Sequence, residues 1–294
     1  MKFQIAILVL TSPLISLAQT AQPKPELLLY HPSTSLSYEV ATIKPLDPKA
    51  ADGMVRLPPG VSNGLSPLSI HRYIMDAYGA IYATQVVGGP DWLNKDSYQI
   101  NAKSPADLEA AMRSMTVTTA NQKRAMQQSL LADHFHLKAR FETRILPVYE
   151  LVPAKSGLKI TAVPAPPERT GKYTPLIQVS AGALPPGTSV SGTRSDGAQE
   201  LNARAIPMEM LARYISSGGA TELESRPIVD HTGFTGYFDI KDFAWARLST
   251  TTTDTSGAPF LQRALEEQLG IKLKPARAPI EVLVIDSIDR PSEN

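Results

Sequence analysis

The sequence predicts an α+β fold built from two tandem, similar domains, each a small sheet covered by two or three short helices. Short segments with apolar residues at helical spacing alternate with segments in which every second residue is apolar. A series of short motifs recurs in the same order in the second half of the chain. Proline accounts for 25 of the 294 residues, which favours short elements and rigid loops.

The internal repeat is clearest in the motif Arg72-Tyr73-Ile74, which recurs as Arg213-Tyr214-Ile215, 141 positions later. Further matched segments follow in the same order: Tyr98–Asn101 with Phe238–Lys241, Phe135–Lys138 with Ile271–Lys274, and Pro147-Val148 with Pro279-Ile280. The alternative is two unrelated halves that share common element types. The predicted organisation is a signal peptide at 1–18, a loose N-terminal lead at 19–36, a first repeat at 37–160, a Pro/Gly-rich linker at 161–198 that joins the two domains, and a second repeat at 199–294.

In the first half, Ser69 is placed to cap a helix that ends near Tyr78, before Gly79. The further elements expected there are a turn at 88–91, a strand at 98–100, helices at 104–113 and 120–132, a half-buried strand at 135–142 and a partner strand at 148–152.

The second half repeats this series. The expected elements are a helix at 207–217, short strands at 227–229 and 237–240, a helix at 259–269 ended by Gly270, and a strand from Ile271. The nearly continuous apolar run 280–285 is typical of a central strand, which is buried on both faces.

Charge and cysteine content exclude several classes of protein. Lys and Arg total 29 against 28 Asp and Glu, so no basic field exists to bind nucleic acid. The absence of cysteine excludes disulfides, a thiolate nucleophile and a lipidated N-terminal cysteine. Lys2, the apolar run 5–10 and the small residues around Ala18 are typical of a cleavable signal peptide. We therefore expect a periplasmic or secreted protein, cleaved after Ala18 and not inserted in the membrane.

His134 and His136 have the best spacing for a metal site, because alternate residues of a strand share a face, and Glu142 is the only nearby acid on that face. Lys138 and Arg140 continue the same face and would repel a cation. A solvated strand edge is therefore the preferred interpretation, and we expect no metal and no cofactor.

Asp230 and His231 could be two members of a hydrolytic triad, but no Gly-x-Ser-x-Gly motif exists to present a nucleophile. A turn acid that caps backbone amides next to a surface histidine is the preferred interpretation. No complete catalytic set is found, so we predict no catalytic residues.

The best candidates for a binding surface are two turns at corresponding places of the repeat, 88–93 and 231–237. Equivalent loops of duplicated domains often face one another across a cleft. The predicted binding residues are Asp91, Trp92, Tyr98, Asp230, His231 and Tyr237. The aromatic residues among them could equally be the largest members of a small core.

Several segments together resemble an exported acidobacterial family of unknown function that is multiplied in soil genomes. They are 38–45, 88–93, Tyr98, 102–103, 130–138, 147–149, 229–239, 267–270, 284–286 and 290–294. The departures are His134 and His231, where the family commonly has arginine and lysine. The resemblance brings no catalytic residues. Related domains are fused to membrane metallopeptidases of the antibiotic-sensing type, which implies a sensing or binding role outside the cytoplasm.

These observations favour a non-catalytic extracytoplasmic binding or protein-interaction module, whose partner is an unknown protein or a small envelope ligand. Two alternatives stay open at this point. One is a secreted hydrolase with an unrecognised His/Asp site, and the other is a regulatory partner of an envelope peptidase.

Overall fold

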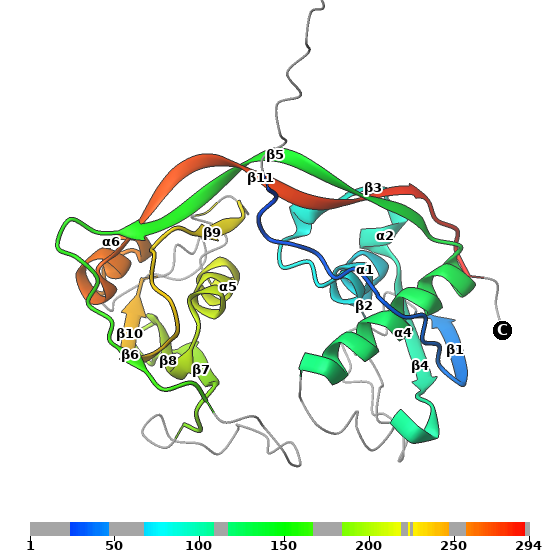
Figure 1. Cartoon of the computed structure of the whole chain (residues 1–294), viewed down its shortest axis with the longest axis horizontal. Coiled ribbons are helices and arrows are strands. Elements are labelled where there is room, and N and C mark those ends of the chain that lie inside the picture. The colour runs from blue at the N-terminus through cyan, green and yellow to red at the C-terminus, as the bar shows by residue number, and fades with distance from the viewer. Residues whose placement is uncertain are drawn as a thin grey trace, which may run out of the picture.

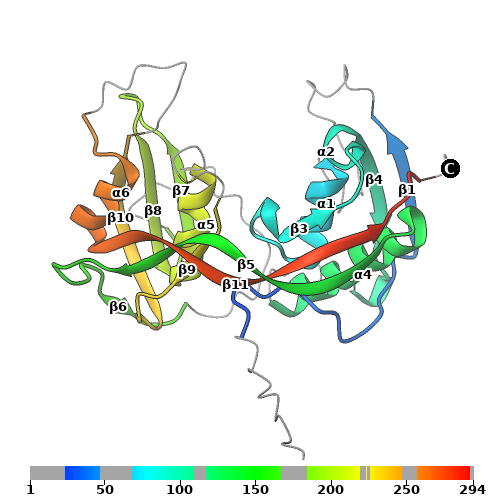
Figure 2. The ribbon, with the colours of Figure 1, turned by 90° about the horizontal axis from the view of Figure 1, so that it is seen from above.

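A long two-stranded ribbon spans both lobes of the protein. The computed structural model describes residues 24–46, 68–108, 117–166, 184–218, 223, 226–246 and 257–291; the predicted signal peptide lies outside these ranges. The ribbon consists of β5 (Lys138–Pro153) and β11 (Ile271–Ser287), which pair antiparallel from Ile271 opposite Pro153 to Ser287 opposite Lys138. It arches over the two lobes in Figure 1 and crosses both in the view from above in Figure 2.

The N-terminal lobe contains a three-stranded antiparallel sheet in the order β1-β4-β2. Its elements are β1 (Val40–Pro45), β2 (Leu68–Ser69), α1 (Ile70–Tyr78), a 3-10 turn (Ala83–Gln85), β3 (Val86–Gly88), α2 (Trp92–Lys95), β4 (Ser97–Lys103) and α4 (Val117–Phe135). The short strand β3 leaves this sheet and pairs in parallel with β11.

The C-terminal lobe contains a four-stranded sheet in the order β6-β10-β8-β7. Its elements are β6 (Ala162–Val163), β7 (Thr188–Thr193), β8 (Gln199–Ile206), α5 (Met208–Gly218), β9 (Ile228–Asp230), β10 (Tyr237–Trp245), α6 (Leu261–Ala264) and a π-helical turn (Leu265–Leu269). Strand β9 pairs in parallel with β5. The structure differs from the predicted linker at 161–198, because β6 and β7 fall within it and lie at the two edges of this sheet, where proline-rich flanks are tolerated.

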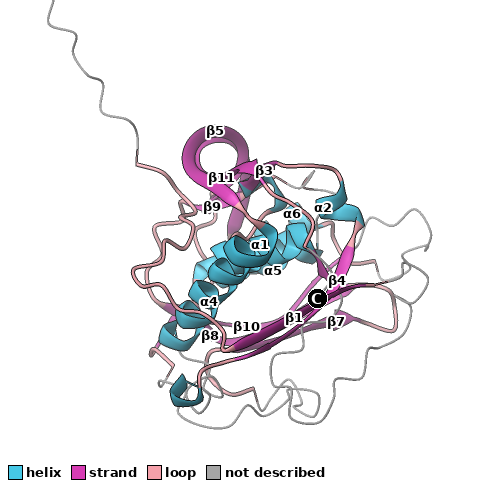
Figure 3. Ribbon diagram, turned by 90° about the vertical axis from the view of Figure 1, so that its right-hand side faces the viewer, coloured by secondary structure: helices cyan, strands magenta, loops and turns pink. Residues whose placement is uncertain are grey.

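Each lobe takes part of its core from the other half of the sequence. The core of the N-terminal lobe includes Leu283 and Ile285 of β11, and that of the C-terminal lobe includes Tyr149 and Leu151 of β5. Figure 3 shows α1, α5 and α6 between the ribbon and the lobe sheets. The opposite face of the ribbon forms a third cluster around Ile280, so β11 is buried on both faces.

The structure confirms the predicted mixture of small sheets and short helices. Helix α1 begins after Ser69, whose hydroxyl accepts from the Arg72 amide, and ends at Gly79 in the left-handed region. Both observed series run helix, short strand, strand, helix, long strand, as the repeat predicts; the duplication itself stays a prediction.

The strand predicted at 135–142 is wrong at its start, since α4 continues through Phe135 and His136 has a φ of 49°. No helix in the described ranges has both the length and the apolar character that a membrane crossing needs.

An N-terminal strap, residues 26–31, crosses the ribbon and is held by Glu281, which is 9% exposed. The Glu281 carboxylate accepts from the Leu29 amide at 2.6 Å and contacts His31 Nε2 at 3.0 Å. The His31 ring stacks on Phe141 with centroids 3.7 Å apart. Further along the strap, the Tyr30 amide donates to the Tyr78 carbonyl at 2.7 Å, which ties the strap to α1.

We predict that Glu281→Ala lowers the free energy of unfolding by roughly 2–3 kcal/mol, because hydrogen bonds to a buried charged group are lost. Urea unfolding followed by circular dichroism measures this. The matched control is Glu266→Ala, an exposed residue, which should change stability by less than about 0.5 kcal/mol. Equal stabilities of the two variants would show that Glu281 does not hold the strap.

We also predict that Gly270→Ala is strongly destabilising. Gly270 has a φ of 67°, and an added Cβ would meet the carbonyl of Gly157 and lie 2.8 Å from the Lys159 nitrogen. We expect the free energy of unfolding to fall by more than about 3 kcal/mol in the same assay. The left-handed φ is unfavourable for alanine, and the backbone at Gly157 and Lys159 must also shift to make room for the Cβ. Gly257→Ala is the control, because its φ is 64° with no atom within 4 Å. It should cost about 1 kcal/mol, and a similar loss in both variants would contradict the close packing at Gly270.

Candidate functional site

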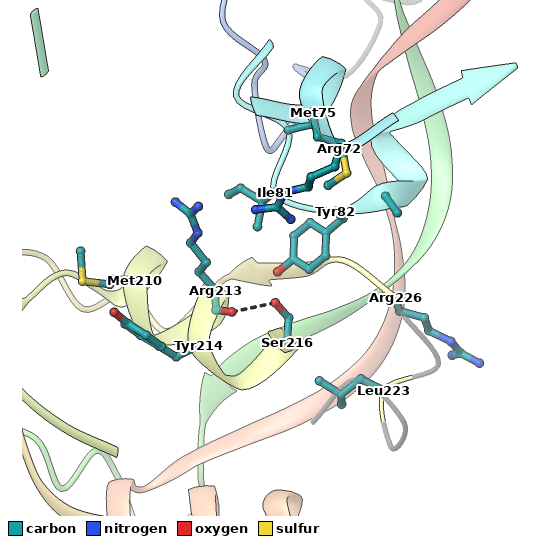
Figure 4. Close-up of a pocket in the computed structure, with 12 residues that line it drawn as sticks. Arg72, Met75, Ile81, Tyr82, Met210, Arg213, Tyr214, Ser216, Leu223 and Arg226 are labelled. Atoms are coloured by element: carbon teal, nitrogen blue, oxygen red, sulfur yellow. Dashed lines mark hydrogen bonds between the residues drawn. The ribbon is translucent and has the colours of Figure 1, made fainter. Parts of the chain in front are cut away.

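The strongest candidate site is a cavity of about 590 Å³ between the two lobes. Helix α1 and the loop after it form one wall, and α5 forms the other together with Leu223 and Arg226 (Figure 4). The lining residues are Arg72, Met75, Ala80, Ile81, Tyr82, Ala83, Met210, Arg213, Tyr214, Ser216, Leu223 and Arg226. Among the residues that the structure describes, the lining therefore has three guanidinium groups and no carboxylate, together with a largely apolar remainder.

Two of these arginines come from opposite walls. Arg72 lies on α1 and Arg213 on α5, and Figure 4 shows both guanidinium groups directed into the space between the helices, whereas Arg226 points away. Arg226 instead lies over the Tyr149 ring at 5.4 Å. Arg72 Nε is 3.4 Å from Asp76 Oδ1, and both side chains are partly exposed. Arg213 has no carboxylate within ion-pair distance among the described residues, so its charge is available to a ligand.

Tyr82 supplies a neutral polar group at the base of the cavity. Its hydroxyl donates to the Ile228 carbonyl at 3.4 Å and is oriented toward Ser216 in Figure 4. Burial raises the pKa of Tyr82, and hydrogen bonds with Ile228 and Ser216 only partly oppose this. The phenol therefore stays protonated at neutral pH and adds no negative charge to the cationic cavity.

A second cavity of about 540 Å³ adjoins the first and shares Ile81 and Arg213 with it. The strap forms one of its walls, with Glu26 and the following four residues. Its other charged residues are Arg124, Glu209 and Asp230, so acids and bases are mixed there. The cationic character is therefore confined to the first cavity.

A family model matches residues 71–288, which run from α1 to the end of β11 and include both lobes. The chain belongs to DUF3738, a family of proteins of unknown function. No curated protein and no solved structure matches it. Membership of an uncharacterised family, as the resemblance predicts, is confirmed. Because the DUF3738 match covers α1, α5 and the ribbon, the interlobe cavity lies within the family's own domain.

The first group of predicted binding residues lies in the N-terminal lobe of this DUF3738 protein, away from the cavity. Trp92 is covered by the guanidinium of Arg290 at 5.2 Å, and Arg290 also pairs with Asp96 at 2.9 Å. Tyr98 is buried and meets the ring of Phe135 edge-on, as a core residue does. Asp91 pairs with Lys95 one helical turn later.

The second group lies beside β5 in the C-terminal lobe. The Asp230 carboxylate accepts from the amide and hydroxyl of Thr232 at 2.9 and 2.7 Å, so it caps the turn. His231 lies between Glu26, at 3.1 Å, and Glu150, at 3.3 Å. Tyr237 begins β10 and pairs with Val163. This arrangement gives Asp230 and His231 different partners, unlike the shared hydrogen bond of a catalytic triad.

The expectation that the two turns face one another is wrong. Gly88 pairs with Ile285 near one end of the ribbon, and Asp230 pairs with Leu151 near the other. Each short strand runs in parallel with its partner, so the turns after β3 and β9 point toward opposite ends of the molecule.

His134 and His136 do not share a strand face. His134 is in the last turn of α4, and His136 lies after it with Nδ1 3.4 Å from Asp289. Glu142, on β5, instead forms hydrogen bonds with Arg144. The described residues contain no group of three or more metal-ligating side chains placed to hold an ion.

Sequence reasoning did not identify Arg72 or Arg213 as site residues. Their signal was present in the repeated Arg-Tyr-Ile motif, which indicates only the repeat when read along the chain. The motif places an arginine at corresponding positions of two helices. Only the folded structure shows that these two helices face each other.

We predict that Asp230→Ala lowers the free energy of unfolding by about 1–2 kcal/mol, because two hydrogen bonds that close the turn are lost. Asp91→Ala is the control, since its ion pair is exposed and should contribute less than about 0.5 kcal/mol. Urea unfolding of both variants gives the comparison. A stable Asp230→Ala protein would remove the structural explanation for this carboxylate.

Proposed function

We propose that this DUF3738 chain is an exported, non-catalytic binding protein that takes a small organic anion in the cavity between its lobes. The observation that carries the proposal is the pair Arg72 and Arg213, which come from different lobes and are directed into one cavity. Guanidinium groups bind carboxylates and phosphates through paired, charge-assisted hydrogen bonds.

The size and lining of the cavity support a small-molecule ligand. Ligand pockets usually occupy about 300–1,000 Å³ and combine an apolar lining with a few polar groups. Met75, Ile81, Met210 and Leu223 supply the apolar part here. Arg72 and Arg213 do not reflect a basic composition, because the whole chain has a formal net charge of only +1. Their concentration in one cavity is therefore a local feature that favours an anion.

Export is part of the proposal and rests on the N-terminal sequence. Lys2, the apolar run 5–10 and the small residues around Ala18 are typical of a cleavable signal peptide. The ligand would then be encountered in the periplasm or outside the cell.

We predict that benzoate and phenyl phosphate bind the protein, whereas benzamide, the uncharged counterpart of benzoate, does not. Ligand-observed NMR detects this class of weak binding. Arg213→Gln should weaken benzoate binding by roughly 10- to 100-fold, because a charge-assisted hydrogen bond in a partly dehydrated site is lost.

Arg263→Gln is the matched control. Arg263 is an exposed arginine of α6 that pairs with Glu267 at 2.6 Å and lies outside the cavity lining. Its benzoate affinity should equal that of the unmodified protein. Equal binding of benzamide and benzoate, or equal losses in the two arginine variants, would contradict an anion site at Arg213.

A further inference from the structure

The cavity residues follow the spacing of the predicted repeat. Three pairs of lining residues are each 141 positions apart: Arg72 with Arg213, Met75 with Ser216, and Tyr82 with Leu223. The buried positions of the two helices match at the same spacing, since Ile70 and Ile74 correspond to Leu211 and Ile215. The two walls therefore present corresponding positions to the cavity, one from each lobe.

This correspondence places one guanidinium on each wall, and both are directed into the same space near Ile81 (Figure 4). Met75, Tyr82 and Leu223 supply less polar side chains to the same lining, and Tyr82 and Leu223 are buried. A ligand with one anionic group pairs with a single wall, unless that group is compact and binds both guanidinium groups at once. A ligand with two anionic groups joined by an apolar body matches both walls.

We infer that the ligand of the cavity carries two separate anionic groups and bridges the lobes, with one group at Arg72 and the other at Arg213. This inference rests on the proposed function, because it specifies the ligand of the same site. Arg72 has Asp76 as a competing partner at 3.4 Å, whereas Arg213 has no such carboxylate among the described residues. The anionic group at Arg213 should therefore contribute more to affinity than the one at Arg72.

The test uses linear dicarboxylates from butanedioate to octanedioate, titrated by isothermal calorimetry at low ionic strength. The monomethyl ester of each acid is its control, because it keeps the length and removes one charge. We expect one spacer length to bind at least about 10-fold more tightly than its monoester, as a second charge-assisted pair forms. Inorganic phosphate tests the alternative that one compact, doubly charged group binds both arginines.

Two variants assign the groups to the walls. Arg72→Gln should reduce the affinity for the best dicarboxylate to about that for its monoester, and Arg213→Gln should reduce it further, while Arg263→Gln leaves it unchanged. Circular dichroism confirms that each variant is folded. Because both arginines are partly exposed on helix surfaces, neither substitution removes core packing.

The outcomes separate the two proposals. If monoesters bind, and Arg213→Gln abolishes that binding, but no dicarboxylate binds more tightly, the bridging inference is wrong and the anion site stands. Inorganic phosphate that binds as tightly as the best dicarboxylate also overturns the inference. If no monoester, dicarboxylate or phosphate binds, the proposed function fails together with it.

Discussion

The pairing of β5 with β11 is the interaction on which the rest of the molecule depends. It joins strands of 16 and 17 residues, far longer than the other strands, and their partners are more than a hundred positions apart in the sequence. Each end of the ribbon lies over one lobe and supplies apolar side chains to its core. The ribbon thus determines how the two lobes are placed and which faces of their helices point toward the space between them. The arginine-lined cavity results from that placement.

The cavity illustrates how a nearly neutral protein can present a concentrated charge. Arg72 and Arg213 belong to separate helices and are remote in sequence, and neither helix alone would bind an anion selectively. The fold brings their faces together, and none of the described lining residues carries a carboxylate. Burial keeps Tyr82 protonated, and the adjoining cavity, which shares Ile81 and Arg213 with this one, contains the acids Glu26, Glu209 and Asp230 together with Arg124. The local concentration of arginine in the first cavity, rather than net charge, gives the site its cationic character.

Local signals in the sequence predicted local structure well. Ser69 and Gly79 predicted the ends of α1, and Gly270 predicted where β11 begins, because capping depends only on near neighbours. The partners of the long strands could not be predicted in this way. No local pattern in residues 138–153 indicates that this strand pairs with β11. The expectation was therefore a hairpin between neighbouring strands at 135–142 and 148–152. For the same reason the site was sought at conspicuous turns, whereas Arg72 and Arg213 become a pair only when α1 and α5 face each other.

The large separation in sequence between β5 and β11 has a consequence for assembly. Until β11 is available, β5 and β3 lack their hydrogen-bonding partner, and the first lobe lacks Leu283 and Ile285. Loop closure over so long a stretch of chain is slow, and unpaired strand edges invite association with other chains. A polypeptide that emerges from a ribosome or through a membrane pore, N-terminus first, would therefore remain incompletely folded until β11 had appeared. Cellular factors that shield nascent chains would have their greatest influence during that interval.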